Sequence, residues 1–205
     1  MLAHGAGSGP WVYDAWPSFF GGWRVETVDL QAGLEVAQAS MTDYAGAVER
    51  AAVDGRRPLV LCGWSLGGLA VLMAAQRERA DLVWMLEPSP PGEIQGFDLE
   101  VPLVSGTYDP EATYGTFPEG VSSRPESMLA RAERKRGISV PVLSCPSVVV
   151  YGKEFPDVRG RAISALYGSE AMEFMDLDHW SLVLDPRIPE ALASRVPRPR
   201  SRPRA

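Results

Sequence analysis

The sequence predicts an α/β fold in which a mostly parallel sheet is flanked by helices and carries a small cap insertion. Short apolar segments alternate with longer segments of helical character, an order typical of parallel strands joined by crossover helices. A serine between two glycines stands where one apolar strand turns into a helix. The 205 residues are 45% hydrophobic, which is enough for one substantial core. We therefore expect a single domain over residues 1–194.

The expected elements follow from apolar runs and from helix-end signals. Strands are expected over residues 2–3, 25–30, 59–62, 82–86, 147–152 and 173–177, and helices over residues 44–52, 69–75, 123–136 and 159–166. The segment 123–126, Ser-Arg-Pro-Glu, has capping-box spacing, and Gly137 closes that helix. Residues 88–146 interrupt the sheet, and we expect them to cap the site and to set substrate specificity.

Composition and charge argue against several classes of protein. The net charge is −6, no apolar run approaches the roughly 20 residues of a membrane span, and no signal peptide is expected. Two cysteines, Cys62 and Cys145, do not indicate a disulfide framework, so a cytoplasmic location is expected. The tail 195–205 holds five arginines and no acid, and we expect it to be disordered and to bind neither nucleic acid nor a membrane. No metal-ligand cluster is expected.

Ser65 is the candidate nucleophile, because Gly63 and Gly67 let a strand and a helix pass closely around an exposed hydroxyl. A serine hydroxyl needs a base to become reactive. The chain has two histidines. His179 follows a strand-like segment far downstream and is the expected base, whereas His4 lies in a glycine-rich loop after the first strand and is expected to be structural.

The run Gly63-Trp64-Ser65-Leu66-Gly67-Gly68, the loop His4-Gly5-Ala6-Gly7 and the downstream His179 together resemble the α/β-hydrolase superfamily. The serine motif looks most like the small esterase and thioesterase branch that includes the carrier-protein methyl ester carboxylesterase of biotin synthesis. The His-Gly loop looks more like plant methyl-ester esterases and hydroxynitrile lyases. The resemblance implies that the backbone N–H groups of Ala6 and Leu66 form an oxyanion hole, and that neither a metal nor a cofactor is needed.

The start of the chain departs from this pattern, because the superfamily normally has two further strands before the His-Gly loop. Only residues 1–3 precede His4. Either the sheet is minimal and has an exposed edge, or a segment upstream is missing, and the second interpretation is slightly favoured.

Three carboxylates compete to complete the triad. Glu154 and Asp157 follow the strand 147–152, where the superfamily usually places the acid. Pro156 favours a helix start there, which makes Asp157 an N-terminal carboxylate and Glu154 the better candidate. Glu87 follows the preceding strand, where pancreatic-type lipases place their acid. The order of preference is Glu154, Glu87, Asp157.

Aromatic and basic residues around these positions allow both structural and functional interpretations. Trp64 and Trp180 adjoin presumed catalytic residues and are expected to line a substrate pocket, while Trp11 and Trp16 fit pocket and packing equally well. Cations at the end of the helix 123–136 offset its dipole. The alternative is a docking patch for an acyl carrier protein or a coenzyme A phosphate. These cations are Arg131, Arg134, Lys135 and Arg136.

The expected function is hydrolysis of a small-molecule carboxylic ester or thioester through an acyl-enzyme. His179 would deprotonate Ser65, and water would release the acyl group. Two alternatives keep the same fold. One is a cofactor-free lyase or cyclase that uses Ser65 and His179 for proton transfer, and the other is a non-catalytic ligand-binding protein.

Overall fold

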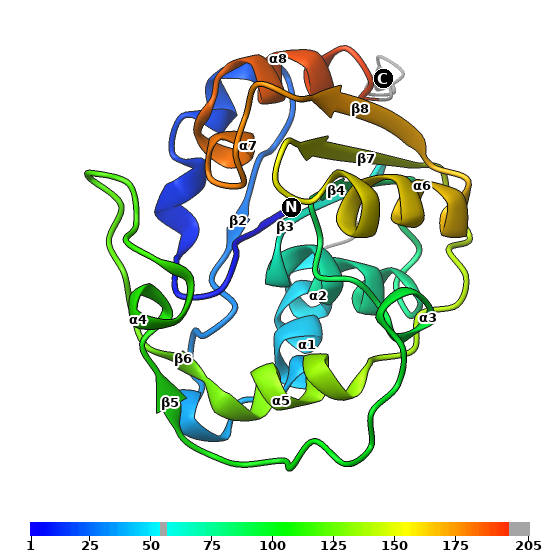
Figure 1. Ribbon diagram of the computed structural model, residues 1–205. Helices are drawn as coiled ribbons and strands as arrows, with labels where there is room; N and C mark the ends of the chain where they lie inside the picture. Colours follow the sequence, from blue (N-terminus) through cyan, green and yellow to red (C-terminus); the bar gives the residue numbers. More distant parts are fainter. Residues whose placement is uncertain (54–56, 197–205) are drawn as a thin grey trace.

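A six-stranded parallel sheet forms the centre of the computed structural model, which describes residues 1–53 and 57–196 (Figure 1). The strand order is β2-β1-β3-β4-β7-β8, and every neighbouring pair is parallel. The strands are β1 Leu2–Ala3, β2 Thr27–Val28, β3 Val60–Trp64, β4 Leu82–Leu86, β7 Ser147–Gly152 and β8 Glu170–Phe174. The α/β class predicted from the sequence is confirmed.

Helices connect the strands and cover both faces of the sheet. The longer ones are α1 Met41–Ala52, α2 Leu66–Ala75, α5 Met128–Arg136, α6 Ala162–Tyr167 and α8 Arg187–Ala193. The shorter ones are α3 Gly92–Gln95, α4 Pro110–Tyr114 and α7 Ser181–Leu184. Three 3-10 turns, η1 Pro10–Tyr13, η2 Trp16–Phe19 and η3 Val36–Gln38, and a π-helical segment, η4 Pro156–Arg161, complete the set.

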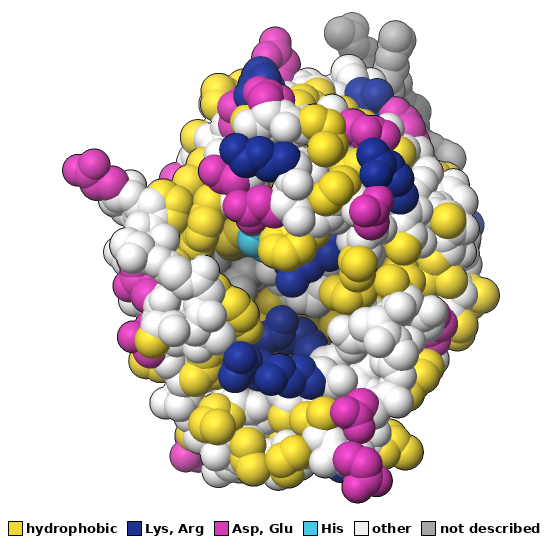
Figure 2. Space-filling model, in the orientation of Figure 1, with side chains coloured by type: hydrophobic (Ala, Val, Ile, Leu, Met, Phe, Trp, Pro, Cys, Tyr) yellow, Lys and Arg dark blue, Asp and Glu magenta, His cyan; other side chains and the backbone are white. Residues whose placement is uncertain are grey.

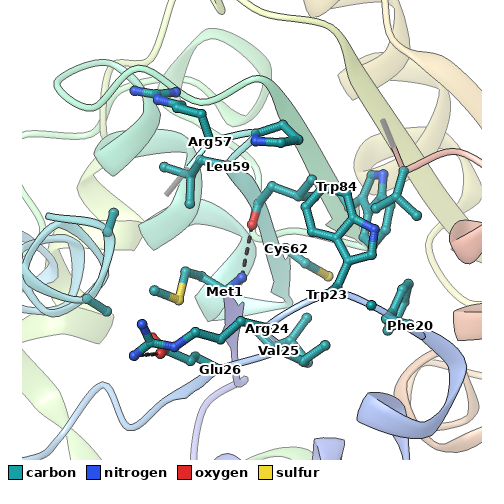
Figure 3. A pocket seen from close by; sticks show the side chains of 17 residues that line it. Met1, Phe20, Trp23, Arg24, Val25, Glu26, Arg57, Leu59, Cys62 and Trp84 are labelled. Carbon is teal, nitrogen blue, oxygen red and sulfur yellow. Dashed lines mark hydrogen bonds and ion pairs between the residues drawn. The ribbon is translucent and has the colours of Figure 1, made fainter. Parts of the chain in front are cut away.

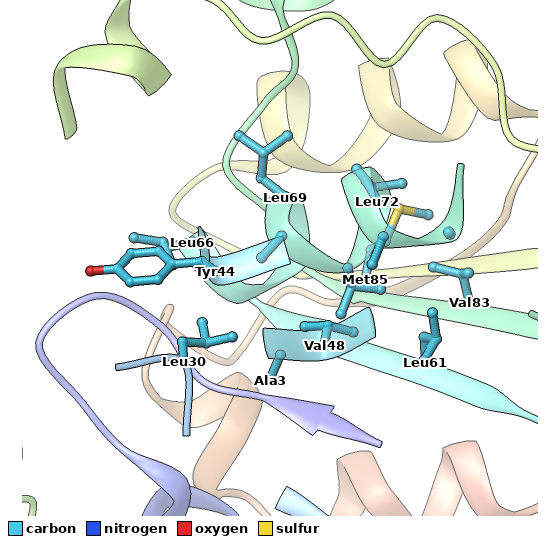
Figure 4. Packing of buried hydrophobic residues seen from close by; sticks show 14 of the residues in the cluster. Ala3, Leu30, Tyr44, Val48, Leu61, Leu66, Leu69, Leu72, Val83 and Met85 are labelled. Atoms are coloured by element: carbon cyan, nitrogen blue, oxygen red, sulfur yellow. The ribbon is translucent and has the colours of Figure 1, made fainter. Parts of the chain in front are cut away.

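The core has two halves because successive residues of a strand point to opposite faces of the sheet. On one face, Tyr44 and Val48 of α1 and Leu69 and Leu72 of α2 pack against strand residues such as Val83 (Figure 4). On the other face, η1, η2, α7 and α8 cover a second cluster. Its strand residues are Leu2, Val60, Cys62, Trp64, Leu82, Trp84, Leu86, Val148 and Val150.

The insertion expected over residues 88–146 lies between β4 and β7 and contains α3, α4, α5 and a small antiparallel pair. This pair joins β5 Thr107–Tyr108 to β6 Glu126–Ser127. The predicted helix start at residue 123 is wrong. Helix α5 begins at Met128, and Ser127 is its N-cap, whose Oγ accepts from the Ala130 N–H at 3.1 Å. Glu126 cannot close a capping box because its carboxylate binds other partners inside the protein.

Two strands differ from their expected ranges. Strand β2 covers two residues, because β1 offers it only Leu2 and Ala3 to pair with. Strand β8 starts three residues earlier than expected, because Gly168 ends α6 in the left-handed conformation, with φ of 62°, and turns the chain directly into the strand. The tail expected to be disordered falls mostly on residues 197–205, which lie outside the described residues.

Within residues 1–53 and 57–196, no helix has both the length and the apolar character needed to cross a bilayer. The same residues contain no group of three or more His, Cys, Asp or Glu side chains arranged to hold a metal ion.

Candidate active site

Ser65 occupies a strained turn between β3 and α2. Its φ of 55° and ψ of −119° lie outside the regions that non-glycine residues usually adopt. The turn is held from both sides, because the Ser65 N–H donates to the Leu86 carbonyl at 3.0 Å and the Ser65 carbonyl accepts from the Ser89 N–H at 2.8 Å. Such strain persists only where surrounding contacts determine it, and it is common at functional sites.

Glycines make this turn possible by removing side chains from its closest contacts. A Cβ at Gly63 would overlap the backbone of Gly67, and a Cβ at Gly67 would overlap the carbonyls of Ala3 and His4. A Cβ at Gly68 would lie 2.6 Å from the Pro88 ring. The first turn of α2 is therefore packed directly on the loop that follows β1.

That loop carries the amide expected in the oxyanion hole. A Cβ at Gly5 would lie 3.2 Å from the Ser65 Cβ, so the loop passes beside the nucleophile. Leu66 is the first residue of α2, and its N–H has no intrahelical acceptor for that reason. The described backbone hydrogen bonds between elements use neither the Ala6 N–H nor the Leu66 N–H. Both amides are thus available for a ligand next to Ser65.

His179 pairs with a fully buried carboxylate. The His179 Nδ1 lies 2.7 Å from the Glu87 Oε2, and the side chain of Glu87 has no solvent-exposed area. The other carboxylate oxygen accepts from the Gly152 N–H at 2.7 Å. Glu87 follows β4 with a φ of 38°, and among the described residues only Ser65 and Glu87 are non-glycine residues with a positive φ. Both strained positions therefore lie at the carboxyl edge of the sheet.

Of the three candidate acids, Glu87 is the one that contacts the His179 ring. Glu154 is exposed, and its carboxylate accepts only from the backbone N–H of His179, at 3.3 Å. Asp157 is also exposed and pairs with Arg161 at 2.7 Å. Strand β4 lies beside β7, and the Glu87 carboxylate that follows β4 reaches both the Gly152 N–H at the end of β7 and the His179 ring. Pro156 does stand at the start of η4, as expected.

Burial controls the electrostatics of His179. Removal from water lowers the pKa of His179 below its ordinary value, the hydrogen bond to Glu87 acts in the opposite direction, and the nearby charge of Arg159 lowers the pKa further. The ring is therefore neutral at neutral pH, which is the form that accepts a proton. Among the hydrogen bonds of the described residues, none joins the Ser65 Oγ to this ring.

The tryptophans separate into supporting and lining positions. Trp64 is 2% exposed, its Nε1–H donates to the His179 carbonyl at 3.0 Å, and its ring centroid lies 5.0 Å from that of His179. Trp64 is therefore buried against His179, whereas from the sequence we expected it on the wall of a substrate pocket. Trp180 is partly exposed and stacks between Trp64 and Phe117 of the insertion, with centroids 4.6 Å and 4.5 Å away.

Trp11 and Trp16 pack inside the N-terminal segment. The Trp11 ring lies against Gly9 and under the guanidinium of Arg124, whose Cζ is 5.3 Å from the ring centroid. Trp16 is buried and donates to the Val183 carbonyl at 2.9 Å. Both side chains hold the loops that frame the site.

The insertion clamps the oxyanion loop through residues that the sequence did not single out for this purpose. The Nε of the Arg124 side chain donates to the Ser8 carbonyl at 2.8 Å, and the Arg124 backbone N–H donates to the Gly7 carbonyl at 2.9 Å. Buried Glu126 accepts from the Gly7 N–H at 3.1 Å and from the Tyr44 hydroxyl. No local motif identifies this clamp, because its partners are more than a hundred residues apart.

His4 has the structural part expected of it. It is buried, and its Nε2 accepts from the Leu30 N–H at 3.1 Å and lies 2.9 Å from a nitrogen of Arg124. The Asp29 carboxylate accepts hydrogen bonds from both Nη atoms of Arg124, at 2.6 Å and 3.1 Å. Hydrogen bonding from His4 and Arg124 holds the pKa of Asp29 far below its ordinary value, so the Asp29 carboxyl group is ionised at neutral pH.

Two hollows are distinct in the structure. Figure 2 shows one face hollowed at its centre, with Lys and Arg side chains around the hollow and a histidine at its rim. Of the two histidines, His4 is buried and the His179 side chain is 16% exposed. A separate cavity of about 230 Å³ lies near Met1, Trp23, Cys62 and Trp84 (Figure 3). Neither Ser65, Glu87 nor His179 lines it, so we do not assign it to the active site.

The fold and the site together define the class. A parallel sheet with a strained serine after β3, and a buried His–Glu pair at the same edge, is the architecture of α/β hydrolases. The sequence profile described as the alpha/beta hydrolase family matches residues 1–202, and the chain belongs to that family. The match does not distinguish the small esterase branch that the motif resembles. A search of curated proteins found no match.

Solved structures share the fold at low identity. A pyrethroid hydrolase from Sphingobium faniae JZ-2 superimposes with a TM-score of 0.71 at 18% identity, over 94% of this chain and 94% of its own. Polyneuridine aldehyde esterase gives 0.63 at 16% identity, over 95% and 96% of the two chains. A lipase-esterase related protein from Clostridium acetobutylicum gives 0.66 at 14% identity, over 95% and 90%.

Proposed function

We propose that the protein hydrolyses carboxylic esters or thioesters through an acyl-enzyme on Ser65. The observation that carries the proposal is the buried pair of His179 and Glu87, 2.7 Å apart, beside a serine held in strained geometry. Family membership and the names of the structural neighbours support the same reaction class. Because these neighbours are at most 18% identical to this chain, we do not transfer their particular substrates to it.

The mechanism follows from the atoms at the site. His179 Nε2 takes the Ser65 hydroxyl proton while Oγ forms a bond to the substrate carbonyl carbon, and Glu87 holds the Nδ1–H that orients the ring. The Ala6 and Leu66 amides donate to the resulting oxyanion, a contribution of a few kcal/mol. The C–O or C–S bond then breaks, and the leaving group takes the proton from Nε2.

Deacylation repeats these steps with water. His179 takes a proton from water, the hydroxide oxygen bonds to the acyl carbon, and Ser65 leaves with the proton from His179. The product is a carboxylic acid, and the enzyme returns to its starting state.

The test combines turnover with covalent labelling. Wild-type protein should release p-nitrophenol from p-nitrophenyl acetate, and a fluorophosphonate should add its mass to the peptide that contains Ser65. Ser65→Ala should lose both signals, while Ser8→Ala, which changes a buried serine in the oxyanion loop, should keep the label. Labelling without turnover would instead favour the lyase or cyclase, and absence of both would favour a binding protein.

A further inference from the structure

Arg134 lies close to the nucleophile although it belongs to the insertion. Its Nη1 donates to the Ser89 Oγ at 3.2 Å, and the Ser89 N–H donates to the Ser65 carbonyl at 2.8 Å. Two hydrogen bonds therefore join this guanidinium to the backbone of Ser65. Its neighbours in α5 behave differently, because Lys135 is exposed and Arg136 donates to the carbonyls of residues 99 and 101.

Arg159 approaches the same site from η4, on the other side. Its Cζ lies 4.2 Å from the centroid of the Phe155 ring. The Phe155 and His179 rings are nearly perpendicular, with an interplanar angle of 87° and centroids 5.5 Å apart. The helix dipole does not explain this cation, because Arg159 lies in the early part of the helical segment 156–167, where a dipole favours negative charge. Arg134 and Arg159 therefore converge from two elements that are distant in the sequence.

In the described part of the chain these cations form no ion pair, although the carboxylate of Glu126 raises the pKa of Arg134 and those of Glu87 and Glu154 act in the same direction on Arg159. Within residues 1–53 and 57–196, no ion pair involves Arg131, Arg134 or Arg159. The Nε and Nη2 atoms of Arg134 are shielded from solvent and lack a hydrogen-bond partner. Arg131 instead stacks on Tyr108 and Tyr114. Burial and the charge of Arg134 lower the pKa of Arg159, whereas the nearby Tyr114, Tyr108 and Glu126 raise the pKa of Arg134 itself. Such an arrangement is costly unless an anion binds there.

We propose that Arg134 and Arg159 bind an oxoanion carried by the substrate, so that the preferred esters are monoesters of dicarboxylic acids. This inference rests on the proposed esterase function. A guanidinium binds a carboxylate through two parallel N–H···O bonds, and each of these arginines is partly exposed. In Figure 2 several Lys and Arg side chains lie at the central hollow near the visible histidine, while others lie among acidic side chains at the top of the view.

The experiment compares each monomethyl dicarboxylate with the methyl ester of the monocarboxylic acid of equal chain length. Wild-type enzyme should prefer the anionic ester by at least about tenfold in kcat/KM, the size expected for charge-assisted hydrogen bonds. Arg134→Gln and Arg159→Gln should each remove most of that preference, measured within each variant as the ratio of kcat/KM for the anionic ester to kcat/KM for the neutral ester. Lys135→Gln, an exposed neighbour on the same helix, should behave as wild type.

Further measurements identify the anion and distinguish failure of the oxoanion site from failure of the esterase function. A stronger preference for a phosphate-bearing ester or thioester would keep the oxoanion site and make phosphate its ligand. Added NaCl should weaken the preference in wild-type enzyme alone, because salt screens charge pairs. The inference fails if neutral esters are hydrolysed equally well, or if the preference survives in both arginine variants. Failure of the esterase function itself would appear as no turnover of any ester and no label on Ser65.

Discussion

Replacing Glu87 with glutamine tests the assignment of the triad acid most directly. Both oxygens of Glu87 face donors, since Oε1 accepts from the Gly152 N–H and Oε2 lies 2.7 Å from the His179 Nδ1. A glutamine amide has one acceptor oxygen and one NH₂ group. One of the two contacts must therefore become a clash between donors, or His179 must adopt the wrong tautomer.

The loss should be large. A wrong tautomer in a serine triad costs about 10⁴ in kcat, which is the value known for the Asp-to-Asn change in the chymotrypsin-type template. We expect Glu87→Gln to lower kcat/KM about 10³–10⁴-fold, which corresponds to roughly 4–5.5 kcal/mol of transition-state stabilisation. The assay is the kcat/KM for p-nitrophenyl acetate, measured after thermal melting has shown that the variant is folded.

The pH profile should move as well, with a definite sign. The contact with Glu87 raises the pKa of His179 against the lowering effect of burial. Without the carboxylate the pKa of His179 falls further, so the acid limb of kcat/KM should shift to lower pH in whatever activity remains. A shift to higher pH would contradict this account of the pair.

Glu154→Gln is the matched control, because it removes a carboxylate that touches His179 only at the backbone. Since that contact is exposed and 3.3 Å long, the change should alter kcat/KM by less than about threefold. The reasoning is refuted if Glu154→Gln abolishes activity while Glu87→Gln retains it.

Two further predictions concern the elbow and the oxyanion loop. Gly67→Ala places a Cβ into the Ala3 and His4 carbonyls and should cost about 3 kcal/mol of stability, or roughly 6–12 °C in Tm, whereas Gly21→Ala meets nothing within 4 Å and should change Tm little. Equal Tm values for the two variants would contradict the packing described. Glu126→Gln weakens the acceptor that holds the Gly7 N–H and should lower kcat by about tenfold with a smaller change in KM, since a displaced oxyanion loop acts on the transition state. Glu119→Gln, on an exposed residue of the insertion, is its control, and an unchanged kcat in Glu126→Gln would exclude the clamp.

The helix in the insertion shows how a local signal can be outweighed. The residues 123–126 have capping-box spacing, yet Glu126 turns inward to Gly7 and Tyr44, and Ser127 becomes the N-cap of α5. Ser123 and Ser127 both carry a hydroxyl that can cap a helix. The choice between them depended on a buried backbone amide more than a hundred residues away, which no local pattern reveals.

The sequence by itself determined the elbow and the candidate base. Those features depend on short-range requirements: glycine at 63 and 67, where a Cβ would overlap backbone atoms, a serine between strand and helix, and a single histidine after a late strand. The tertiary structure alone decided the carboxylate, the clamp on the oxyanion loop and the unpaired arginines. Each depends on which strand ends and loops become neighbours. The strand order that places β4 beside β7, and so Glu87 beside His179, is a property of the packed sheet.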